Sequence, residues 1–339
     1  MQVSVEPVWE ERSDQLDFRF GGYVVWRVPL RALSLQSNPF VVSPDLPVPL
    51  DEAVKKGYRA TVKYGTLIGA DFPAIRIDNG SLRYVARYGE RYVVDLSGSF
   101  GEYLYKFSNK SRNTLKRKVK KISETNSRFA TIQDFRSPTD IRTFREIAIG
   151  ISRQSYKREF GWGFREDESF ARQLEIDADA CLVRGYVLNL RDEPAAYVFC
   201  RIDHDVIIYK HLGHDERYTQ YSPGTVLLYL LLERLFDESE FRLLDFDGME
   251  HIPYKEFFAT RMLRCGRVMW FPLTVSNTAL VGGHWIITAA WRFVTARRDT
   301  ARRNHDKWVS VRDLSPLWSR ILSAPRRSLC EEVDQRDAK

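Results

Sequence analysis

The chain has 339 residues, of which 44% are hydrophobic, 13% aromatic and 29% charged, the composition of an ordinary soluble globular protein. This length suffices for two domains of about 100–200 residues each, and the lack of an internal period or a low-complexity segment excludes repeat architectures. The formal net charge of +7 favours a polyanionic partner, such as a phosphate-bearing cofactor, an acidic carrier protein, a nucleic acid or a membrane face, without choosing among them.

Residues 1–100 read as short strands joined by turns, without a catalytic constellation. Turns are expected at Asp78–Ser81 and at Tyr88–Arg91, so part of this region should form antiparallel hairpins. We interpret it as a structural or acceptor-shaping domain. The β-rich runs cover residues 23–26, 59–64, 82–85 and 91–95.

A cationic helix is predicted over residues 107–124. The segment from Lys106 to Lys121 contains eight basic residues and no acidic ones. Like charges at i,i+4 destabilise a helix by roughly a few tenths of a kcal/mol for each pair, so the pattern favours an anionic partner over a merely solvated surface. A thin apolar stripe should hold the helix against the protein, and it consists of Leu115, Val119 and Ile122.

Two amphipathic helices follow, over residues 138–156 and 166–178. The loop between them, residues 158–164, interleaves glycines with Trp162 and two phenylalanines. Such a loop either covers a substrate site or closes a core. Three strands are then expected over residues 181–190, 194–202 and 205–212.

The stretch from Asp205 to Phe258 organises the rest of the chain. A β-rich run over residues 206–209 precedes a long helix that ends near Phe236, and a strand over residues 241–246 follows. The helix is apolar almost all round, so we expect it to be buried between a sheet and other structure. The unit ends in a second, shorter helix.

The turn before the long helix has the sequence Ser-Pro-Gly-Thr. Ser222 suits an N-cap, and Pro223 suits the first helical position, where its missing N–H costs nothing. Gly224 has no Cβ, so an anion can approach the backbone closely there. The N–H groups of this first turn, which ends at Thr225, would attract a phosphate, although an ordinary capped helix would have the same sequence.

The C-terminal part begins with a strand over residues 268–273. An apolar stretch over residues 278–294 follows, interrupted by two glycines and a histidine, and the basic segment ARRDTARR comes directly after it. The stretch is too short and too broken to span a bilayer. We expect either peripheral membrane contact through residues 278–303 or a helix packed across the two domains. The tail beyond Asn304 should be poorly ordered towards its end.

The segment YKHLGHDERYTQYSPGTVLLYLLLERL, followed by LLDFDGMEHIPYKEFFA, resembles the GNAT acyltransferase superfamily, in particular the branch named for the cellulose-biosynthesis protein CelD/BcsL. In that branch a G-x-D…SPG block precedes the cofactor helix, and an FD…G…YK block follows the next strand. Asp247, where a small residue is expected, and the insertion-like MEHIP depart from this pattern. The matching positions are Gly213, Asp215, Ser222, Pro223, Gly224, Asp245, Gly248, Tyr254 and Lys255.

The basic helix extends the resemblance. Its S-x-K-x-R-N-x-L-x-x-K pattern is similar to the same branch and to the related Fem aminoacyltransferases, where a basic helix joins two halves. Arg112, Asn113 and Lys116 are the matching positions. We assign substrate or phosphate binding to these three residues and to Trp162 of the aromatic loop.

The resemblance covers about residues 95–275 and implies an α/β (α+β) GNAT fold, with a mixed, mostly antiparallel central sheet flanked by helices. The element order read from pattern alone agrees with it. Three consecutive segments are expected. Residues 1–100 would be a smaller, degenerate GNAT-like domain, residues 101–275 the catalytic domain, and residues 276–339 an apolar and basic helical extension.

Acyl transfer from a thioester needs a cradle for the cofactor's pyrophosphate, polarisation of the carbonyl, a base for the acceptor and an acid for the thiolate. In GNAT proteins a backbone N–H on the strand before the cofactor helix polarises the carbonyl, and here that strand end lies near Lys210, His211 and Leu212. Leu212 and Gly213 are assigned to cofactor binding. A tyrosine on the helix after the next strand protonates the thiolate, which implies Tyr254. Lys255, beside it, would contact phosphate or pair with an acidic residue.

The base stays open. His211 is slightly ahead, because the unperturbed pKa of histidine lies near neutrality. Strict alternation along the strand places the His211 and Tyr209 side chains on one face. Asp215 and Asp245 match family positions and are catalytic candidates, although either carboxylate would serve equally well to fix a loop.

We therefore expect an acyl-CoA-dependent N-acyltransferase, in the simplest case an acetyltransferase, that acts by direct transfer with acetyl-CoA or another acyl-CoA as co-substrate. The acceptor would be an amine, such as an amino sugar or a precursor of a polysaccharide or secondary metabolite. An acyl carrier protein is an alternative donor, and DNA is not an expected partner. Two other readings stay open: a Fem-type aminoacyltransferase that uses charged tRNA, and a non-catalytic GNAT-like module that binds a partner or a membrane face.

The remaining composition carries less information. The cysteines form no CxxC pair, and the six histidines have no metal-like spacing, so we expect reduced thiols and no metal. The N-terminus lacks the basic and apolar segments of a signal peptide. These features favour a cytoplasmic protein, with membrane-peripheral contact as the variant. The cysteines are Cys181, Cys200, Cys265 and Cys330.

Overall fold

The computed structural model describes residues 8–20, 23–35, 38–41, 46–69, 71–125, 132–154 and 163–306, with residues 292–306 as backbone only. Within these ranges the chain forms two compact units. Unit 1 contains residues 38–41 and 89–265, and unit 2 contains residues 8–35, 46–88 and 266–306.

Both units are discontinuous along the chain. Strands β5 (Ser81–Asp95) and β11 (Arg261–Pro272) each begin in one unit and end in the other. The units therefore differ from the three consecutive segments that the sequence predicts. The physical reason is that a long strand can contribute to both units. A boundary drawn from the sequence assumes instead that the chain passes from one unit to the next only once.

The strands of unit 1 form a mixed, mostly antiparallel sheet in the order β5–β10–β9–β8–β7–β6. β10 pairs in parallel with β9 and antiparallel with β5, and the remaining neighbours are antiparallel. The predicted fold class is confirmed. The bounds are Ile132–Phe135 (β6), Val183–Leu190 (β7), Glu193–Asp203 (β8), Val206–His214 (β9) and Leu243–Asp245 (β10).

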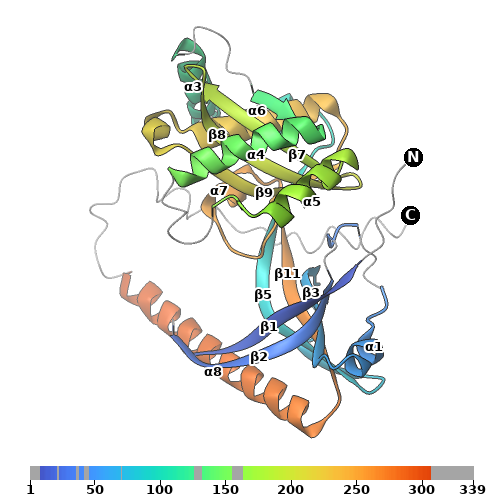
Figure 1. Cartoon of the computed structure of the whole chain (residues 1–339). Coiled ribbons are helices and arrows are strands. Elements are labelled where there is room, and N and C mark those ends of the chain that lie inside the picture. The colour runs from blue at the N-terminus through green and yellow to red at the C-terminus, as the bar shows by residue number, and fades with distance from the viewer. Residues whose placement is uncertain are drawn as a thin grey trace, which may run out of the picture. The chain divides into compact units, whose positions relative to one another are not determined.

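Helices cover both faces of this sheet (Figure 1). α4 and α5 share one apolar cluster with β7 and β8. α2, α3, α6 and α7 share another cluster on the opposite face. The bounds are Phe100–Leu104 (α2), Asn109–Thr125 (α3), Pro138–Arg153 (α4), Glu168–Asp179 (α5), Pro223–Glu238 (α6) and Pro253–Phe258 (α7).

α6 is buried as its apolar sequence predicts. Leu227, Leu231 and Leu232 have no exposed surface, and full burial of a leucine side chain stabilises a fold by about 1.5–3 kcal/mol. On the side away from the sheet, the ring of Phe100 in α2 meets the ring of Tyr229 edge-on, with 5.1 Å between centroids. The helix is thus held between the sheet and other helices.

The cationic helix α3 is anchored by the predicted apolar stripe. Leu115 and Ile122 are buried, and Val119 packs partly buried beside them in the α6 cluster. The two amphipathic helices are also confirmed. α4 begins with a capping box, in which the Ser137 hydroxyl accepts from the Asp140 N–H.

The predicted turn at Tyr88–Arg91 is wrong, because β5 runs through it without interruption. Gly89 is there for a different reason: a Cβ at this position would lie 2.3 Å from the carbonyl oxygen of Met249. The glycine therefore permits a close approach of two backbones rather than a turn. The other predicted turn is confirmed, since Asn79 and Gly80 have positive φ between β4 and β5.

Unit 2 is built on a long antiparallel ladder, the β1–β2 ribbon, whose register runs from Trp9 opposite Leu35 to Phe20 opposite Tyr23. Its strand order is β1–β2–β3–β11–β5, and β4 pairs with β5. A core that includes Leu16, Tyr84 and Phe271 lies under this sheet. The bounds are Trp9–Phe20 (β1), Tyr23–Leu35 (β2), Leu50–Lys55 (α1), Ala60–Leu67 (β3) and Ile75–Asp78 (β4).

Helix α8 (Val275–Asp306) packs along β1. Its His284 is buried, with Nδ1 2.6 Å from the Tyr84 hydroxyl and Nε2 3.2 Å from the carbonyl oxygen of Asp17. The apolar stretch predicted from the sequence is thus part of a longer helix. Among the residues that the structure describes, no helix is long and apolar enough to cross a bilayer.

Candidate functional site

β9 contains an extra residue at Lys210. Tyr209 pairs with Cys200, but His211 pairs with Phe199, the next residue along β8, so Lys210 forms a β-bulge. Tyr209 consequently joins the α6 cluster, whereas the His211 ring packs on Phe199 of the α4 cluster. The prediction that Tyr209 and His211 share a face is wrong, because an inserted residue shifts the alternation by one.

The bulge lies where β9 and β10 part. Their parallel pairing extends over three residues and ends with Asp245 opposite Ile208. Beyond that point β9 continues to His214 against β8, while the chain after Asp245 leaves the ladder. The second half of β9 therefore has a strand neighbour on one side and α6 and α7 nearby on the other.

The first turn of α6 lies at this parting. A 3₁₀ helix (Glu216–Tyr221) leads into Ser222, whose φ of 53° is left-handed, and the Ser222 carbonyl accepts from the N–H groups of Thr225 and Val226 at 3.0 and 3.2 Å. The expected cap is not formed, because the Ser222 side chain makes no capping hydrogen bond. A Cβ on Gly224 would lie 3.3 Å from the Leu212 side chain of β9. The positive end of the helix dipole is thereby placed beside the end of β9.

Cationic groups of α3 adjoin the same turn. The Lys121 ammonium lies 4.8 Å from the Tyr221 ring centroid and donates to the Gln220 carbonyl at 3.2 Å. Of the three predicted residues, Asn113 and Lys116 are exposed, and the Arg112 guanidinium lies over the Tyr105 ring. Lys121 of α3 thus contacts the end of the 3₁₀ helix before α6. The sequence places it in the basic run but does not single it out.

Tyr254, the predicted acid, lies on α7 and packs partly buried in the α6 cluster. Its ring centroid is 6.3 Å from those of Tyr209 and Phe246. Burial raises the pKa of Tyr254 above its usual 10, so the phenol is protonated at neutral pH. The hydroxyl of the buried Tyr209 interacts with that of Tyr254. Two phenols thus meet where β9 and β10 part.

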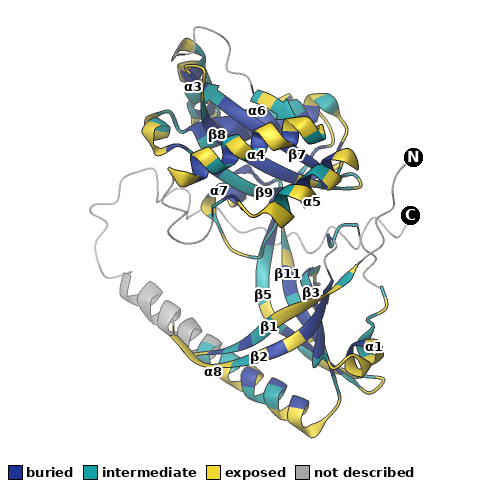
Figure 2. Cartoon of the chain, viewed as in Figure 1, coloured by how far each residue is buried: buried dark blue, intermediate teal, exposed yellow. Residues whose placement is uncertain are grey.

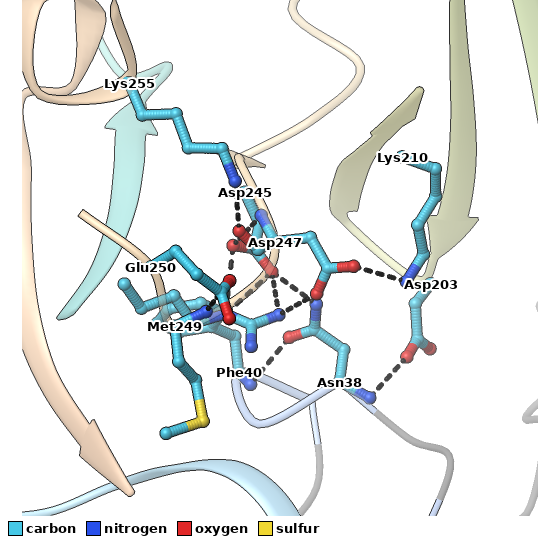
Figure 3. Close-up of polar contacts among 10 residues, drawn as sticks. Asn38, Phe40, Asp203, Lys210, Asp245, Asp247, Met249, Glu250 and Lys255 are labelled. Atoms are coloured by element: carbon cyan, nitrogen blue, oxygen red, sulfur yellow. Dashed lines mark hydrogen bonds and ion pairs between the residues drawn. The ribbon is translucent and has the colours of Figure 1, made fainter. Parts of the chain in front are cut away.

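Asp245 ends β10 in a buried ion pair. The Arg91 guanidinium donates to it, with Nη2–Oδ2 and Nε–Oδ1 distances of 2.5 and 3.0 Å. The Asn38 side-chain amide donates to Oδ2 at 2.8 Å (Figure 3). The N–H of Asp247 donates to Oδ1 at 3.0 Å. Both carboxylate oxygens are therefore occupied, and they fix the chain where it leaves the sheet.

Asp247 links this network to the bulge. Its Oδ2 accepts from the Lys210 ammonium at 2.7 Å, and its Oδ1 accepts from Arg91 at 3.1 Å. Burial opposes ionisation, but Lys210 and Arg91 outweigh it and lower the pKa of Asp247 to about 2. The Lys255 ammonium donates to the Asp247 carbonyl at 2.7 Å, and burial lowers the pKa of this lysine. Asp247, which departs from the family pattern, thus forms an ion pair with Lys210 of the bulge (Figure 3).

Two other predicted residues have local structural tasks. Asp215 is buried and accepts from the Arg217 backbone and guanidinium, which fixes the start of the 3₁₀ helix. A Cβ on Gly213 would lie 2.2 Å from the Tyr197 ring, so this glycine makes room for an aromatic side chain. Trp162, the predicted substrate contact, lies outside the described residues.

The side chains of His211, which is part of β9, and of Tyr254 lie on opposite faces of the sheet. The His211 ring is half-buried, stacked on Phe199 at 6.4 Å and edge-on to Phe164 at 5.9 Å between centroids. Its cluster contains α4 and α5, whereas Tyr254 belongs to the cluster of α6. An imidazole and a phenol thus flank the second half of β9.

His251 is a titratable group that the sequence reasoning missed. Its Nδ1 lies 2.7 Å from the Tyr92 hydroxyl, and its two nitrogens are 3.6 Å from carboxylates of Glu90 and Glu256. It lies in the MEHIP segment, three residues before Tyr254. The insertion relative to the family pattern was the signal, because an added segment beside a site brings its own side chains.

No group of three or more histidine, cysteine or acidic residues suited to a metal occurs among the described residues. Cys200 and Cys265 are buried free thiols, and Cys181 is an exposed one.

The family comparison gives one match. Residues 109–256 match the family model described as an acetyltransferase (GNAT) domain. This segment runs from α3 to α7 and includes the bulge, the first turn of α6 and Tyr254. No curated protein matches the sequence significantly.

Several solved structures are similar to the chain. The C-terminal domain of a putative lysylphosphatidylglycerol synthetase from Agrobacterium fabrum is 12% identical, with 76% of this chain and 82% of that chain covered and a TM-score of 0.50. FemX is 11% identical, with 80% and 90% covered and a TM-score of 0.49. A tandem GNAT protein from the clavulanic acid biosynthesis pathway is 14% identical, with 74% and 80% covered and a TM-score of 0.38. At these identities the likeness concerns the fold alone, and unit 1 has the GNAT fold that the sequence predicts.

Proposed function

We propose that this protein is an acyl-CoA-dependent N-acyltransferase that transfers the acyl group directly to an amine. One observation carries the proposal: the first turn of a long helix lies beside the bulged half of β9, where β10 has ended. A helix N-terminus binds a pyrophosphate through its backbone N–H groups and its dipole. We infer that an extended thioester lies alongside β9 beyond the point where β10 ends.

The donor would be held by two elements. The first turn of α6, from Ser222 to Thr225, would bind the pyrophosphate through the positive end of the helix dipole and the Gly224 N–H, because the N–H groups of Ser222 and Thr225 already donate to carbonyls. Lys121 and the exposed basic residues of α3 would neutralise further phosphate charge. Lys210, the extra residue of the bulge, marks the stretch of β9 to which we assign polarisation of the thioester carbonyl.

The chemistry would use groups on both faces of β9. The amine nitrogen attacks the thioester carbonyl, so that a C–N bond forms and the C–S bond breaks. His211 takes the proton released by the amine, and Tyr254 gives its proton to the departing thiolate. The raised pKa of Tyr254 keeps that proton available at neutral pH.

Asp245 and Lys255 would then be positioning residues rather than reacting ones. Arg91, Asn38 and the Asp247 backbone occupy the Asp245 carboxylate, and the Lys255 ammonium is bonded to a carbonyl. Together they hold the segment that leads from β10 to α7. Their effect on Tyr254 would be geometric.

The family branch narrows the acceptor. The SPG and YK blocks resemble CelD/BcsL-like proteins, which favours an amino sugar or another precursor amine of a surface polysaccharide or secondary metabolite. Acetyl-CoA is the simplest donor. The reaction would take place in the cytoplasm, where CoA thioesters are made.

A second candidate function rests on α3. Its Lys110, Lys116, Arg117, Lys120 and Lys121 are exposed, a cationic face large enough to hold nucleic-acid backbone. A Fem-type aminoacyltransferase would use it to bind charged tRNA. Retention of tRNA that falls steeply with salt, with no affinity for acyl-CoA, would favour this function over the first.

Calorimetry with acetyl-CoA and longer acyl-CoAs tests the donor site. We expect micromolar binding to the wild type, and loss of binding in Gly224→Asp, which adds a negative charge at the helix N-terminus. Gly224→Ala adds only the Cβ near Leu212 and isolates the steric effect. Gly150→Asp adds the same charge at an exposed glycine on α4 with open space around it. A folded wild type that bound no acyl-CoA would end the CoA mechanism.

Replacement of Tyr254 by phenylalanine tests the acid. We expect acyl-CoA binding to persist and kcat to fall by about 10²–10⁴-fold, because one positioned proton donor is removed. Tyr105→Phe is the control, since its exposed hydroxyl lies outside the site. If Tyr254→Phe leaves kcat unchanged, the tyrosine is only packing, and the non-catalytic binding module gains support.

A further inference from the structure

β9 changes from buried to open at its bulge. Its residues from Val206 to Tyr209 are buried, whereas Lys210 is exposed and Leu212 is half-buried (Figure 2). In the proposed function the donor starts at the first turn of α6, which lies beside Leu212, and follows the open half of β9. Its acyl end therefore points towards the buried half, at the place where β9 and β10 meet.

On the α6 face of the sheet, three aromatic rings close this meeting place. The rings of Tyr209 and Phe246 lie edge-on with 5.4 Å between their centroids, and the Tyr254 ring is 6.3 Å from each of them. Phe246 has no exposed surface, and Tyr209 is 3% exposed. Because protein interiors are close-packed, extra methylene groups inserted among such rings would cause strain.

The backbone holds Phe246 in this position. Phe246 is the first residue after β10, and its N–H donates to the Tyr92 carbonyl of β5 at 3.0 Å. The residue before it, Asp245, is fixed by the buried ion pair with Arg91. With the backbone fixed, the ring can make room only by changing its rotamer inside a packed cluster. A long acyl chain would have to force that change.

On the opposite face, charged groups close the same place. The Lys210 ammonium and the Asp247 carboxylate form an ion pair at 2.7 Å between β9 and the chain beyond β10, and Asp247 also accepts from Arg91 (Figure 3). Arg91 and Asp245 are themselves buried. An alkyl chain inserted here would separate these ions, and a buried charge without its partner is costly. Neither face therefore accommodates a long acyl chain.

We propose that Phe246, with Tyr209 beside it, determines acyl length and restricts the donor to a short acyl group such as acetyl. This inference rests on the proposed function, because it requires the thioester to lie along β9. In a channel with an open apolar end, each buried methylene group raises affinity by roughly fourfold. The closed end removes that gain, so affinity should fall as the acyl chain lengthens.

Calorimetry of the full chain with acetyl-CoA, butyryl-CoA and octanoyl-CoA tests the proposal. The wild type should bind acetyl-CoA more tightly than octanoyl-CoA by about tenfold or more. Phe246→Ala removes the ring and should tighten octanoyl-CoA binding by about tenfold or more, with little change for acetyl-CoA. Phe246→Leu removes less volume, so it should remain folded more readily and shift the preference in the same direction by a smaller factor. Competition with acetyl-CoA ensures that the same site is measured.

Phe236→Ala is the matched control. Phe236 belongs to the same apolar cluster and is 4% exposed, but it packs on Phe100 and Tyr103 near the other end of α6. Its truncation should destabilise the fold much as Phe246→Ala does, because both remove a buried phenyl ring. It should leave the acyl-length preference of the wild type unchanged.

The outcomes separate the acyl limit from the donor site. Tight binding of octanoyl-CoA by the wild type, equal to that of acetyl-CoA, would overturn the proposal and leave the donor site intact. The same holds if both Phe246 variants keep the wild-type preference, or if Phe236→Ala relaxes it as much as Phe246→Ala does. A folded wild type that binds no acyl-CoA of any length would instead overturn the donor site, and this inference with it.

Discussion

α6 and α8 are two apolar helices that the protein covers to different extents. α6 lies between a sheet and other helices, and its leucines at 227, 231, 232 and 235 have no exposed surface. α8 packs on the sheet of unit 2, mainly along β1, and exposes Trp285 and Ile286. Apolar composition therefore does not reveal burial by itself. Burial depends on how many neighbouring elements cover the helix. A helix that is covered on one side keeps its other side available for a partner.

The largest expected effect concerns the buried ion pair of unit 1, the unit that also contains α6. Asp245→Asn removes the buried carboxylate that pairs with Arg91 and leaves Asp247 as the remaining anionic partner, so we expect the free energy of unfolding to fall by up to about 3–5 kcal/mol. Asp205→Asn is the control, because the Asp205 carboxylate pairs with the exposed Arg242 and should contribute about 0–1 kcal/mol. Urea unfolding measures both. Similar losses of stability in the two variants would mean that the buried Arg91–Asp245 pair contributes no more than an exposed ion pair.

Leu231→Ala breaks the packing around α6. This side chain is fully buried, so its truncation should leave a cavity and lower the free energy of unfolding by about 2–5 kcal/mol. The variant should remain folded, and its denaturant midpoint should shift without a change in slope. A loss of less than about 1 kcal/mol would mean that α6 is less enclosed than its neighbours indicate.

His284 makes the covered side of α8 sensitive to pH. Burial lowers the pKa of His284 below its usual 6.5, with the Asp17 carbonyl opposing in part. The unfolded chain then binds a proton at higher pH than the folded one, so the stabilising contribution is present above pH 6.5 and is lost as pH falls through 6.5 towards the folded pKa. Unfolding of the wild type and of His284→Leu between about pH 7.5 and 5.5 isolates this contribution. An unchanged pH dependence in the variant would contradict it.

The smallest expected effect concerns the bare side of α8. Ile286→Ser removes an exposed apolar side chain, and the free energy of unfolding in solution should change by about 0.5 kcal/mol or less. The ratio of this change to the loss of stability in Leu231→Ala compares the burial of the two helices. A large destabilisation of Ile286→Ser would mean that the protein itself covers this side.

The elements with a strong local signal could be predicted from the sequence. The Ser-Pro-Gly start and the leucine run of α6, the capped amphipathic helix α4, and the strands β7, β8 and β9 all appear close to their predicted positions. Each is determined by side chains a few residues apart. The closed environment of α6 also follows, because no polar face is left for solvent.

The site was only partly predictable, because its geometry depends on contacts far along the chain. The bulge at Lys210 is stabilised by Asp247, 37 residues away, and it reverses the faces that alternation assigns. In the sequence Gly89 resembles a turn residue. Only the close approach of the Met249 backbone explains why a glycine is needed there. Asn38, which binds Asp245, is separated from it by 207 residues. No local pattern carries such information.

The pairing of Arg91 with Asp245 has a consequence for how the chain is made. The two residues are 154 positions apart, so a ribosome adding about 5–20 residues per second exposes Arg91 on the order of 10–30 s before its partner emerges. During that interval the nascent chain holds most of unit 1's apolar strands without β10, which lies between β5 and β9. Expression of residues 101–275 alone would leave the same pair unformed for the opposite reason, because Asp245 would then be present without Arg91.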